Sequence, residues 1–380
     1  MTSKKNISIS TPTTGEDEWL AVKEPLMSGW ITSGPKVKEF EKKFAQRHSV
    51  KHAIAVTSAT TALHLAIASL GIKQDDEVIV PAFTWVSTAN AVRYQGAKVV
   101  FADINPDTFN IDVNDLKKKI TKKTQAIIPV HLFGLCADMN LIQEAADGIP
   151  LIEDAACAAG AEYKNKPVGS LGNITCFSFH PRKSITTGEG GMITTDNDDT
   201  AELIKNLRNH GASISEEERI NGSKPYLLPE FNMLGYNYRM TDIQAAIGIV
   251  QLSKLDKFIN EREKWAKFYN EKLAVLNWVT TPKFHSDYKH GWQSYVIYID
   301  ENKSPLTRNE IMEYLQSHGI STRPGTHAVH MLGYYSNLYE LKPEDFPNAR
   351  NANNFSIAIP LHNKMTEEDY NYIVEKLLAL

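Results

Sequence analysis

The segment FSFHPRKSITTGEGG, residues 177–191, is the stretch that best indicates how this chain folds. An apolar, strand-like run (Phe177, Ser178, Phe179) ends in a His-Pro turn, which presents Lys183 just before a glycine-rich stretch. A lysine amine becomes a good nucleophile when burial and neighbouring positive charge lower its pKa. Most lysines lie in solvent, so an ordinary loop lysine is the alternative. The segment therefore predicts a strand end that displays one lysine beside flexible backbone.

Short apolar runs surround this segment and alternate with helical stretches. The helices are expected at residues 60–70 and 87–94, and the strands at residues 53–56, 77–80, 98–102, 125–130, 151–153, 174–179 and 192–195. Runs of this length and apolarity are typical of strands that are buried on both faces. The alternation predicts an α/β fold with a mainly parallel, doubly wound sheet, in which ligands bind at the carboxyl ends of the strands.

The remainder of the chain predicts a smaller, second domain. A long amphipathic helix is expected over residues 241–276, with Thr241 as its N-cap. Strand 294–299 and helices 307–318 and 366–378 follow it, as in a small α+β domain. We expect a large domain over residues 1–250 and a small one over residues 251–380. The polar segment 213–224 is expected to be a surface loop.

Composition excludes several classes of protein. The net charge of −4 and the pI near 6.3 provide no basic surface for nucleic acid. No apolar run is long enough to cross a membrane or to act as a signal peptide, so a cytoplasmic location is expected. Cys136, Cys157 and Cys176 form no CxxC or Cys/His pattern, which predicts neither disulfides nor a metal site.

Three further features lie after expected strands. The turn Thr57–Leu63 joins a strand to a helix and offers an anion site for a phosphate, although Ser and Thr there also cap helices. Asp154 could hold a protonated pyridine nitrogen or cap the next helix. Trp85 could lie flat against a cofactor ring or fill the core. Together with Lys183 they are expected at one edge of the sheet, which favours a common binding site.

The chain resembles the DegT/DnrJ/EryC1/StrS family of sugar aminotransferases, which are fold-type I enzymes that use pyridoxal phosphate. The resemblance covers nearly the whole chain and rests on the segments SGWITSGPKVKEFE (28–41), TSATTALHLA (57–66), VPAFTWVSTANAV (80–92), PVHLFG (129–134), EDAACAAGAEYKNKPVGSLG (153–172), CFSFHPRKSITTGEGGM (176–192) and GYNYRMTDIQAAIG (235–248). It implies a large cofactor-binding domain and a smaller C-terminal α+β domain.

The resemblance also implies a role for individual residues. Lys183 would form the Schiff base with pyridoxal phosphate and later move the proton, and Asp154 would pair with the pyridine nitrogen. Trp85 would stack on the ring. The remaining cofactor contacts would be Ala59, Thr60 and Ser178 at the phosphate, Asn237 from the neighbouring subunit of a homodimer with shared sites, and Cys157 beside the ring.

Two of these positions depart from the family pattern. Cys157 stands where relatives often have His or Gln, and a thiol is a poor partner for the 3-hydroxyl of the cofactor. Ala59 stands where many relatives have glycine, which requires a phosphate turn without positive φ.

For the substrate, the resemblance implies a ping-pong transfer from an amino donor, usually L-glutamate, to a nucleotide-linked keto-sugar. ITTGEGG after the lysine is similar to members that aminate C4 of a 4-keto-6-deoxy sugar. A keto-inositol, a 3-keto-sugar or an aldehyde-bearing sugar acid is the alternative acceptor. Residues expected near the substrate are Thr32, Ser33, Gly34, Arg323 and His327.

Two other classes of protein fit less well. A dinucleotide oxidoreductase needs a glycine-rich turn such as GxGxxG, and none opens the first strand–helix unit. A non-catalytic regulator would be expected to lose Lys183 or to add a nucleic-acid-binding segment, and the chain does neither.

Overall fold

The computed structural model describes residues 6–214, 226 and 228–380, and most of the segment 213–224, predicted as a loop, lies outside them. At its centre lie seven strands, which form two hydrogen-bonded sheets joined by bridges from Ile127 to Leu151 and from Val130 to Asp154. In spatial order the strands are β1 (His52–Val56), β10 (Gly191–Thr195), β9 (Ile174–Ser178), β6 (Ile152–Asp154), β5 (Thr124–Ile127), β2 (Glu77–Pro81) and β4 (Lys98–Ala102).

The sheet is mainly parallel, as predicted. Strands β4, β2 and β5 pair in parallel, and so do β6 and β9, whereas β10 runs antiparallel to both of its neighbours. Parallel neighbours need a long crossover, usually a helix, but antiparallel neighbours need only a short connection. Residues 179–190 between β9 and β10 contain no helix, and this short connection is the segment that presents Lys183.

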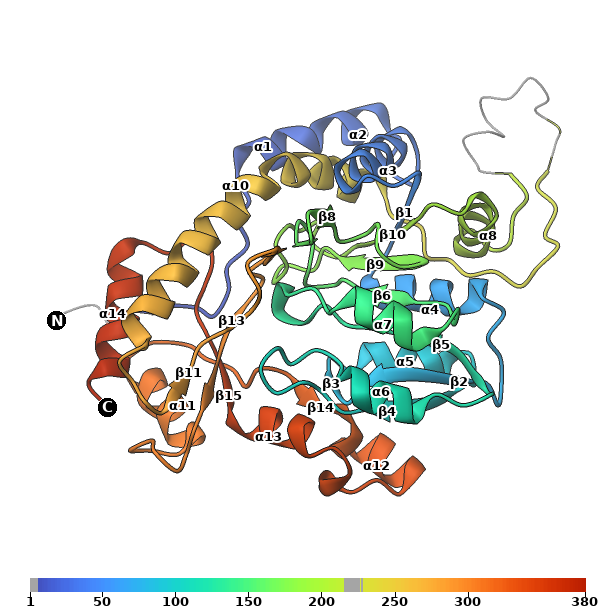
Figure 1. The fold of residues 1–380 in the computed structure, drawn as a ribbon. Helices are drawn as coiled ribbons and strands as arrows, with labels where there is room; N and C mark the ends of the chain where they lie inside the picture. Colours follow the sequence, from blue (N-terminus) through green and yellow to red (C-terminus); the bar gives the residue numbers. More distant parts are fainter. Residues whose placement is uncertain (1–5, 215–225, 227) are drawn as a thin grey trace.

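Helices cover both faces of the sheet (Figure 1). Within β1, Ile54 and Val56 belong to one hydrophobic core and Ala53 and Ala55 to the other, because alternate side chains point to opposite faces. The first core includes residues of α4 (Ala59–Ser69), α5 (Ser87–Tyr94) and α8 (Asp198–Arg208). The second includes residues of α3 (Pro35–His48), α6 (Val113–Lys119), α7 (Met139–Ala146) and α10 (Asp242–Leu273). The sheet is therefore doubly wound.

Helix α10 spans 32 residues and connects the two parts of the molecule (Figure 1). It begins after Thr241, whose side chain accepts a hydrogen bond from the Gln244 amide, as the N-cap prediction requires. Its last turns supply Trp265, Tyr269 and Leu273 to a third core. The predicted domain boundary at residue 250 falls inside this helix and stays a prediction.

The third core packs around a small antiparallel sheet of β11 (Val279–Thr280), β13 (Tyr295–Ile299) and β15 (Ser356–Ile359). Helices α11 (Arg308–Ser317) and α14 (Glu367–Leu378) cover it, close to the predicted ranges. The remaining elements are α1 (Glu16–Ala21), α2 (Lys23–Ser28), β3 (Phe83–Thr84), β7 (Glu162–Tyr163), β8 (Lys166–Pro167), β12 (Tyr288–Lys289), β14 (His327–Ala328), α12 (Gly333–Tyr339) and α13 (Pro347–Phe355).

Candidate active site

Parallel strands end at the same edge of a sheet, and this edge gathers the predicted residues. Asp154 is the last residue of β6 and Ser178 the last of β9, and these two strands are neighbours. Thr57 follows β1, which has the same direction as β9 because β10 is antiparallel to both. Strand β3, which precedes Trp85, pairs with β14 of the C-terminal part.

Lys183 lies in a tight turn directly after β9. Its backbone amide donates to the carbonyl of His180 at 2.8 Å, and its Nζ lies 3.2 Å from Sγ of Cys157. Both side chains are half-buried, so the amine faces the protein rather than solvent. Nδ1 of His180 accepts a hydrogen bond from the amide of Arg182 at 3.2 Å, and burial lowers the pKa of His180. His180 is thus a packed residue of the turn.

Asp154 presents a buried carboxylate that no basic group neutralises. Its Oδ2 accepts a hydrogen bond from the hydroxyl of Thr88 at 2.7 Å, and its Oδ1 accepts one from the amide of Ala156 at 3.1 Å. Within residues 6–214, 226 and 228–380, no lysine, arginine or histidine pairs with it. A buried carboxylate of this kind is suited to receive a cationic ligand group.

Thr88 is a site residue that the sequence analysis missed. It is fully buried on α5, and its hydroxyl lies 3.1 Å from that of Thr84, which can donate to it. A possible signal was a hydroxyl residue three positions after Trp85 in VPAFTWVSTANAV, at the start of an expected helix.

The sequence left two functions open for the turn after β1, helix capping and anion binding, and the structure assigns them to different residues. Ser58 and Thr61 cap α4: the Ser58 hydroxyl accepts from the Thr61 amide at 3.2 Å, and Thr61 Oγ1 accepts from the Ser58 amide at 3.0 Å. Thr60 makes no side-chain hydrogen bond within the described part of the chain, and the first amides of a helix have no partner inside it. Ala59 and Thr60 therefore leave a helix N-terminus available for an anion.

Ala59 opens α4 as its first helical residue and is not among the residues with positive φ, so alanine replaces glycine here without strain. Ser178 lies beside this turn. It pairs with Gly191 across β9 and β10, and a Cβ on Gly191 would lie 2.5 Å from the carbonyl carbon of Ser58. Only glycine permits this approach, which places β10 directly against the turn.

Trp85 does not fill the core, because 58% of its surface is exposed. Its ring centroid lies 5.4 Å from that of His327, with the planes at 72°. Strand β14, which begins at His327, pairs with β3 and brings the C-terminal part of the chain to the site. The indole is thus available as an aromatic platform, and the His327 ring packs roughly perpendicular to it.

Arg323 lies in the same C-terminal segment and is exposed. Its amide donates to the carbonyl of Ala358 at 3.2 Å, which fixes its backbone beside β15. Burial and, secondly, the positive charge of Arg323 lower the pKa of Arg182, next to the lysine. The carbonyl of Arg182 also accepts a hydrogen bond from Gln293 Nε2 at 2.9 Å. Positive charge from both parts of the chain therefore meets near Lys183.

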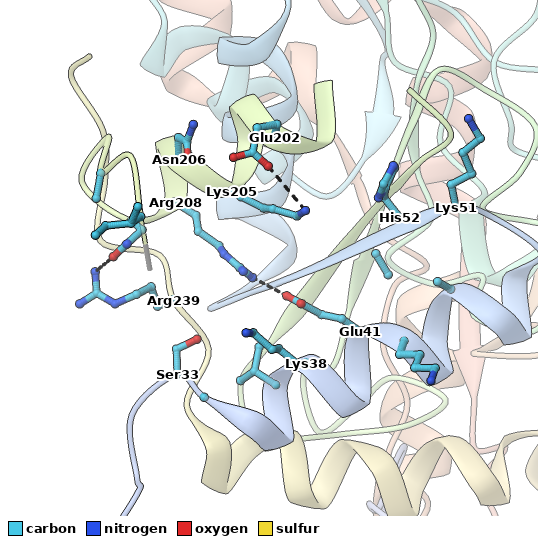
Figure 2. Close-up of a pocket in the computed structure, with 18 of the residues that line it drawn as sticks. Ser33, Lys38, Glu41, Lys51, His52, Glu202, Lys205, Asn206, Arg208 and Arg239 are labelled. Carbon is cyan, nitrogen blue, oxygen red and sulfur yellow. Dashed lines mark hydrogen bonds and ion pairs between the residues drawn. The ribbon is translucent and has the colours of Figure 1, made fainter. Parts of the chain in front are cut away.

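Thr32, Ser33 and Gly34 line a different part of the surface. They belong to a cavity of about 550 Å³ between α3 and α8, whose lining includes Arg208 and Arg239 but neither Lys183 nor Asp154. Figure 2 shows Arg208 directed toward Glu41 across this cavity. The structure of one chain thus does not bring these three residues together with the lysine.

Asn237 is exposed in an extended segment that runs beside the end of α8. Its neighbours Tyr236 and Tyr238 face inward, where the Tyr238 hydroxyl lies 3.1 Å from Nδ1 of His64 on α4. Because alternate side chains of an extended segment point to opposite sides, Asn237 faces outward.

Comparison with known proteins identifies the kind of enzyme to which this site belongs. The sequence pattern of the DegT/DnrJ/EryC1/StrS aminotransferase family matches residues 12–378. The chain belongs to this family. It is 40% identical to the spore coat polysaccharide biosynthesis protein SpsC of Bacillus subtilis, with 99% of this chain and 97% of SpsC covered.

Two other relatives extend the comparison. The chain is 40% identical to GDP-perosamine synthase of Caulobacter vibrioides, with 99% of both chains covered. The pyridoxal phosphate form of the sugar aminotransferase Spr1654 from Streptococcus pneumoniae superimposes with a TM-score of 0.90 at 29% identity, and 99% of this chain and 100% of that chain are covered.

The protein is accordingly a fold-type I sugar aminotransferase, and its cofactor is pyridoxal phosphate. The described residues fit this cofactor. Asp154 offers an unneutralised carboxylate, the start of α4 offers an anion site, and Lys183 offers an amine at the same sheet edge. Within the described ranges, no group of three potential metal ligands occurs, and no helix there is both long and apolar enough to cross a membrane.

Proposed function

We propose that this enzyme transfers an amino group from L-glutamate to C4 of a nucleotide-linked 4-keto-6-deoxy sugar. Two features support this choice of substrate. The segment ITTGEGG after Lys183 is similar to that of family members that aminate C4. The name of the relative GDP-perosamine synthase also specifies a sugar linked to a nucleotide.

The observation that supports the chemistry most strongly is the buried carboxylate of Asp154, which lies one strand away from the lysine turn and has no basic partner among the described residues. Pyridoxal phosphate, when bound, supplies a ring that accepts the electron pair released at the reacting carbon. Asp154 would keep the ring nitrogen protonated, which would make the ring a better electron acceptor.

Lys183 then has two tasks at one atom. Its Nζ would hold the cofactor covalently and, when free, would take up and return the proton of the reacting carbon. Cys157 Sγ accepts a hydrogen bond from this Nζ at 3.2 Å and so gives the freed amine a resting position. Trp85 would stack on the cofactor ring, and Ala59, Thr60 and Ser178 would hold its phosphate.

Positive charge near Lys183 suits an anionic substrate. Arg323, whose charge acts on Arg182, pairs with the diphosphate of the nucleotide sugar or with a carboxylate of the donor. His327 borders the sugar beside Trp85. Thr32, Ser33 and Gly34 contact the sugar and its diphosphate, and Asn237 reaches the cofactor phosphate in the site of a neighbouring subunit, so the working unit is a homodimer with shared sites.

Two experiments test this proposal. Purified protein should show the yellow absorbance of a bound Schiff base that borohydride removes, and Lys183→Ala should lack both the absorbance and turnover with glutamate. A panel of nucleotide-linked keto-sugars, with products analysed by mass spectrometry and NMR, then identifies the acceptor. Full turnover by Lys183→Ala refutes the mechanism, and amination only of a 3-keto-sugar, keto-inositol or aldehyde-bearing sugar acid refutes the proposed substrate.

A further inference from the structure

Glu153, the residue before Asp154 on β6, is a second buried acidic residue. The side chains of Glu153 and His131 are both fully buried, and Oε2 of Glu153 lies 2.7 Å from Nε2 of His131. The other oxygen, Oε1, accepts hydrogen bonds from the amide of Gly172 at 2.6 Å and from the hydroxyl of Thr175 at 2.7 Å. Both oxygens of the carboxyl group are therefore occupied by protein groups.

The hydrogen-bond network determines where the protons lie. The amide of Ala137 donates to Nδ1 of His131 at 3.1 Å, so Nδ1 carries no proton. The remaining ring proton is then on Nε2 and is donated to Glu153. A protonated Glu153 could not donate to an Nε2 that already bears a proton. The pair is accordingly a neutral imidazole and an ionised carboxylate, and within the described residues no lysine or arginine pairs with Glu153.

This carboxylate is tied to the residues that hold Asp154 in place. The amide of His131 donates to the carbonyl of Asp154 at 3.0 Å, and the amide of Asp154 donates to the carbonyl of Pro129 at 2.9 Å. Thr175, which donates to Glu153, precedes Cys176, the residue that pairs with Asp154 across β6 and β9. The network thus joins the three segments that surround the end of β6.

The charges of both carboxylates reach the same part of the interior. Burial raises the pKa of the Cys176 thiol well above its usual value, and the negative charges of Asp154 and then Glu153 raise it further. A charge in such a poorly solvated region acts over a longer range than a charge in water. Two negative charges therefore favour a positive charge on a ligand at this edge.

We propose that Glu153, oriented by His131, is a positioning residue that fixes Asp154 and supplies a second buried negative charge favouring the protonated ring nitrogen of the cofactor. This inference rests on the proposed assignment of Asp154 to that nitrogen. Glu153 and its neighbour Asp154 point to opposite faces of the sheet, so Glu153 acts through the strand and its field and does not contact the ring.

The test uses Glu153→Gln, which keeps the shape of the side chain and removes its charge. The nitrogen-15 chemical shift of ring-labelled pyridoxal phosphate in the holoenzyme reports the protonation of the ring nitrogen. We expect the signal of Glu153→Gln to move toward the neutral form, and the rate of amino-group uptake from glutamate to fall by about tenfold, which corresponds to about 1.4 kcal/mol. An unchanged nitrogen signal overturns the inference.

A cofactor analogue in which CH replaces the ring nitrogen separates this role from a merely structural one. If Glu153 acts through the ring nitrogen, Glu153→Gln and the parent protein should take up the amino group at similar rates with the analogue. An equal loss with both cofactors contradicts the inference. Glu162→Gln is the matched control, because Glu162 pairs with Lys289 at 3.0 Å on the separate strand β7 and should leave the nitrogen signal unchanged.

Two further variants keep the outcome decisive. In Glu153→Gln, the side-chain amide NH2 faces the Nε2 proton of His131, and both groups are donors. The double variant Glu153→Gln/His131→Phe removes this conflict and keeps a ring at position 131. It should show the same shift of the nitrogen signal if the single variant does not fold. Asp154→Asn tests the underlying assignment. If Asp154→Asn leaves the nitrogen signal unchanged, the proposed role of Asp154 fails, whereas a shift in Asp154→Asn alone refutes only the inference about Glu153.

Discussion

At the scale of single residues, the site depends on donors that replace water around the buried carboxylate of Asp154. An ionised carboxylate is costly to bury unless hydrogen bonds replace its water. Thr88 supplies one of these at 2.7 Å, and Thr84 lies 3.1 Å from the Thr88 hydroxyl and completes a chain of hydroxyl groups. The buried carboxylate of Asp154 therefore relies on a neutral side chain from another strand–helix unit.

Replacing Thr88 by valine tests this dependence. Thr88→Val keeps the volume but leaves Asp154 Oδ2 and the Thr84 hydroxyl without their partner, so the free energy of unfolding of the cofactor-free protein should fall by about 2 kcal/mol. Thr84→Val, which removes only a hydrogen bond between neutral groups, should cost about half as much. Chemical denaturation of the three proteins measures the difference, and equal stability of Thr88→Val and the parent contradicts the expectation.

At the scale of elements, the end of α3 buries an ionisable side chain, His48, in surroundings that disfavour its charged form. His48 is the last residue of this helix, and its ring stacks on that of Phe44 with centroids 4.0 Å apart. Nδ1 lies 3.0 Å from the carbonyl of Phe44, while Nε2 has no partner within the described part of the chain. Complete burial lowers the pKa of His48 to about 4.

This shift makes stability depend on pH. Between pH 6.5 and pH 4 the unfolded chain binds a proton at His48 and the folded chain does not, so stability is full above pH 6.5 and falls as the pH drops toward 4. The loss attributable to His48 is on the order of 3 kcal/mol. His48→Phe keeps the stacking and should be less sensitive to acid when unfolding is followed at pH 7 and pH 5. An identical pH dependence in both proteins contradicts this assignment.

At the scale of the whole molecule, the proposed homodimer gives the exposed Asn237 a role in the site of the neighbouring subunit. The rings of Tyr236 and Tyr238 stack on each other with centroids 5.2 Å apart, and the Tyr236 ring lies 4.7 Å from that of His64, which leaves Asn237 on the outer side of the segment. If sites are shared, Asn237 serves the partner's phosphate while Lys183 serves its own chain. Loss of either residue then inactivates a different site of the dimer.

Mixed dimers distinguish shared sites from independent ones. Lys183→Ala and Asn237→Ala homodimers should each have little activity, but subunit exchange between them creates dimers with one intact site. With random exchange, half of the dimers are mixed and about a quarter of the sites are intact, so activity should recover to about a quarter of the parent value. If mixing restores nothing although exchange is demonstrated, each chain forms its site alone.

Much of the fold could be predicted from sequence because its signals are local. The apolar runs predicted the seven central strands, six of them to within one residue at each end, whereas the strand predicted over residues 125–130 is β5, Thr124–Ile127; Thr241 correctly marked the start of α10. The edge that gathers Lys183, Asp154 and Thr60 followed from the rule that parallel strands end together. Whether Trp85 fills the core or stays exposed as a platform for a ring could not be predicted from nearby residues, since its exposure depends on how β14 packs beside it.

The sequence by itself determined the α/β architecture, because the periodicity of apolar residues encodes it, and the family, because contiguous motifs carry the resemblance; through that resemblance it also predicted the roles of Lys183 and Asp154. Only the tertiary structure decided the partners of these residues. Thr88 meets Asp154 across 66 positions, Cys157 meets Lys183 across 26, and His131 meets Glu153 across 22. Such contacts arise from the packing of separate strands and helices, and no local pattern specifies them. Residues 177–191 thus indicate the type of reaction, while the packing of other segments around them determines which charged and polar groups surround the site.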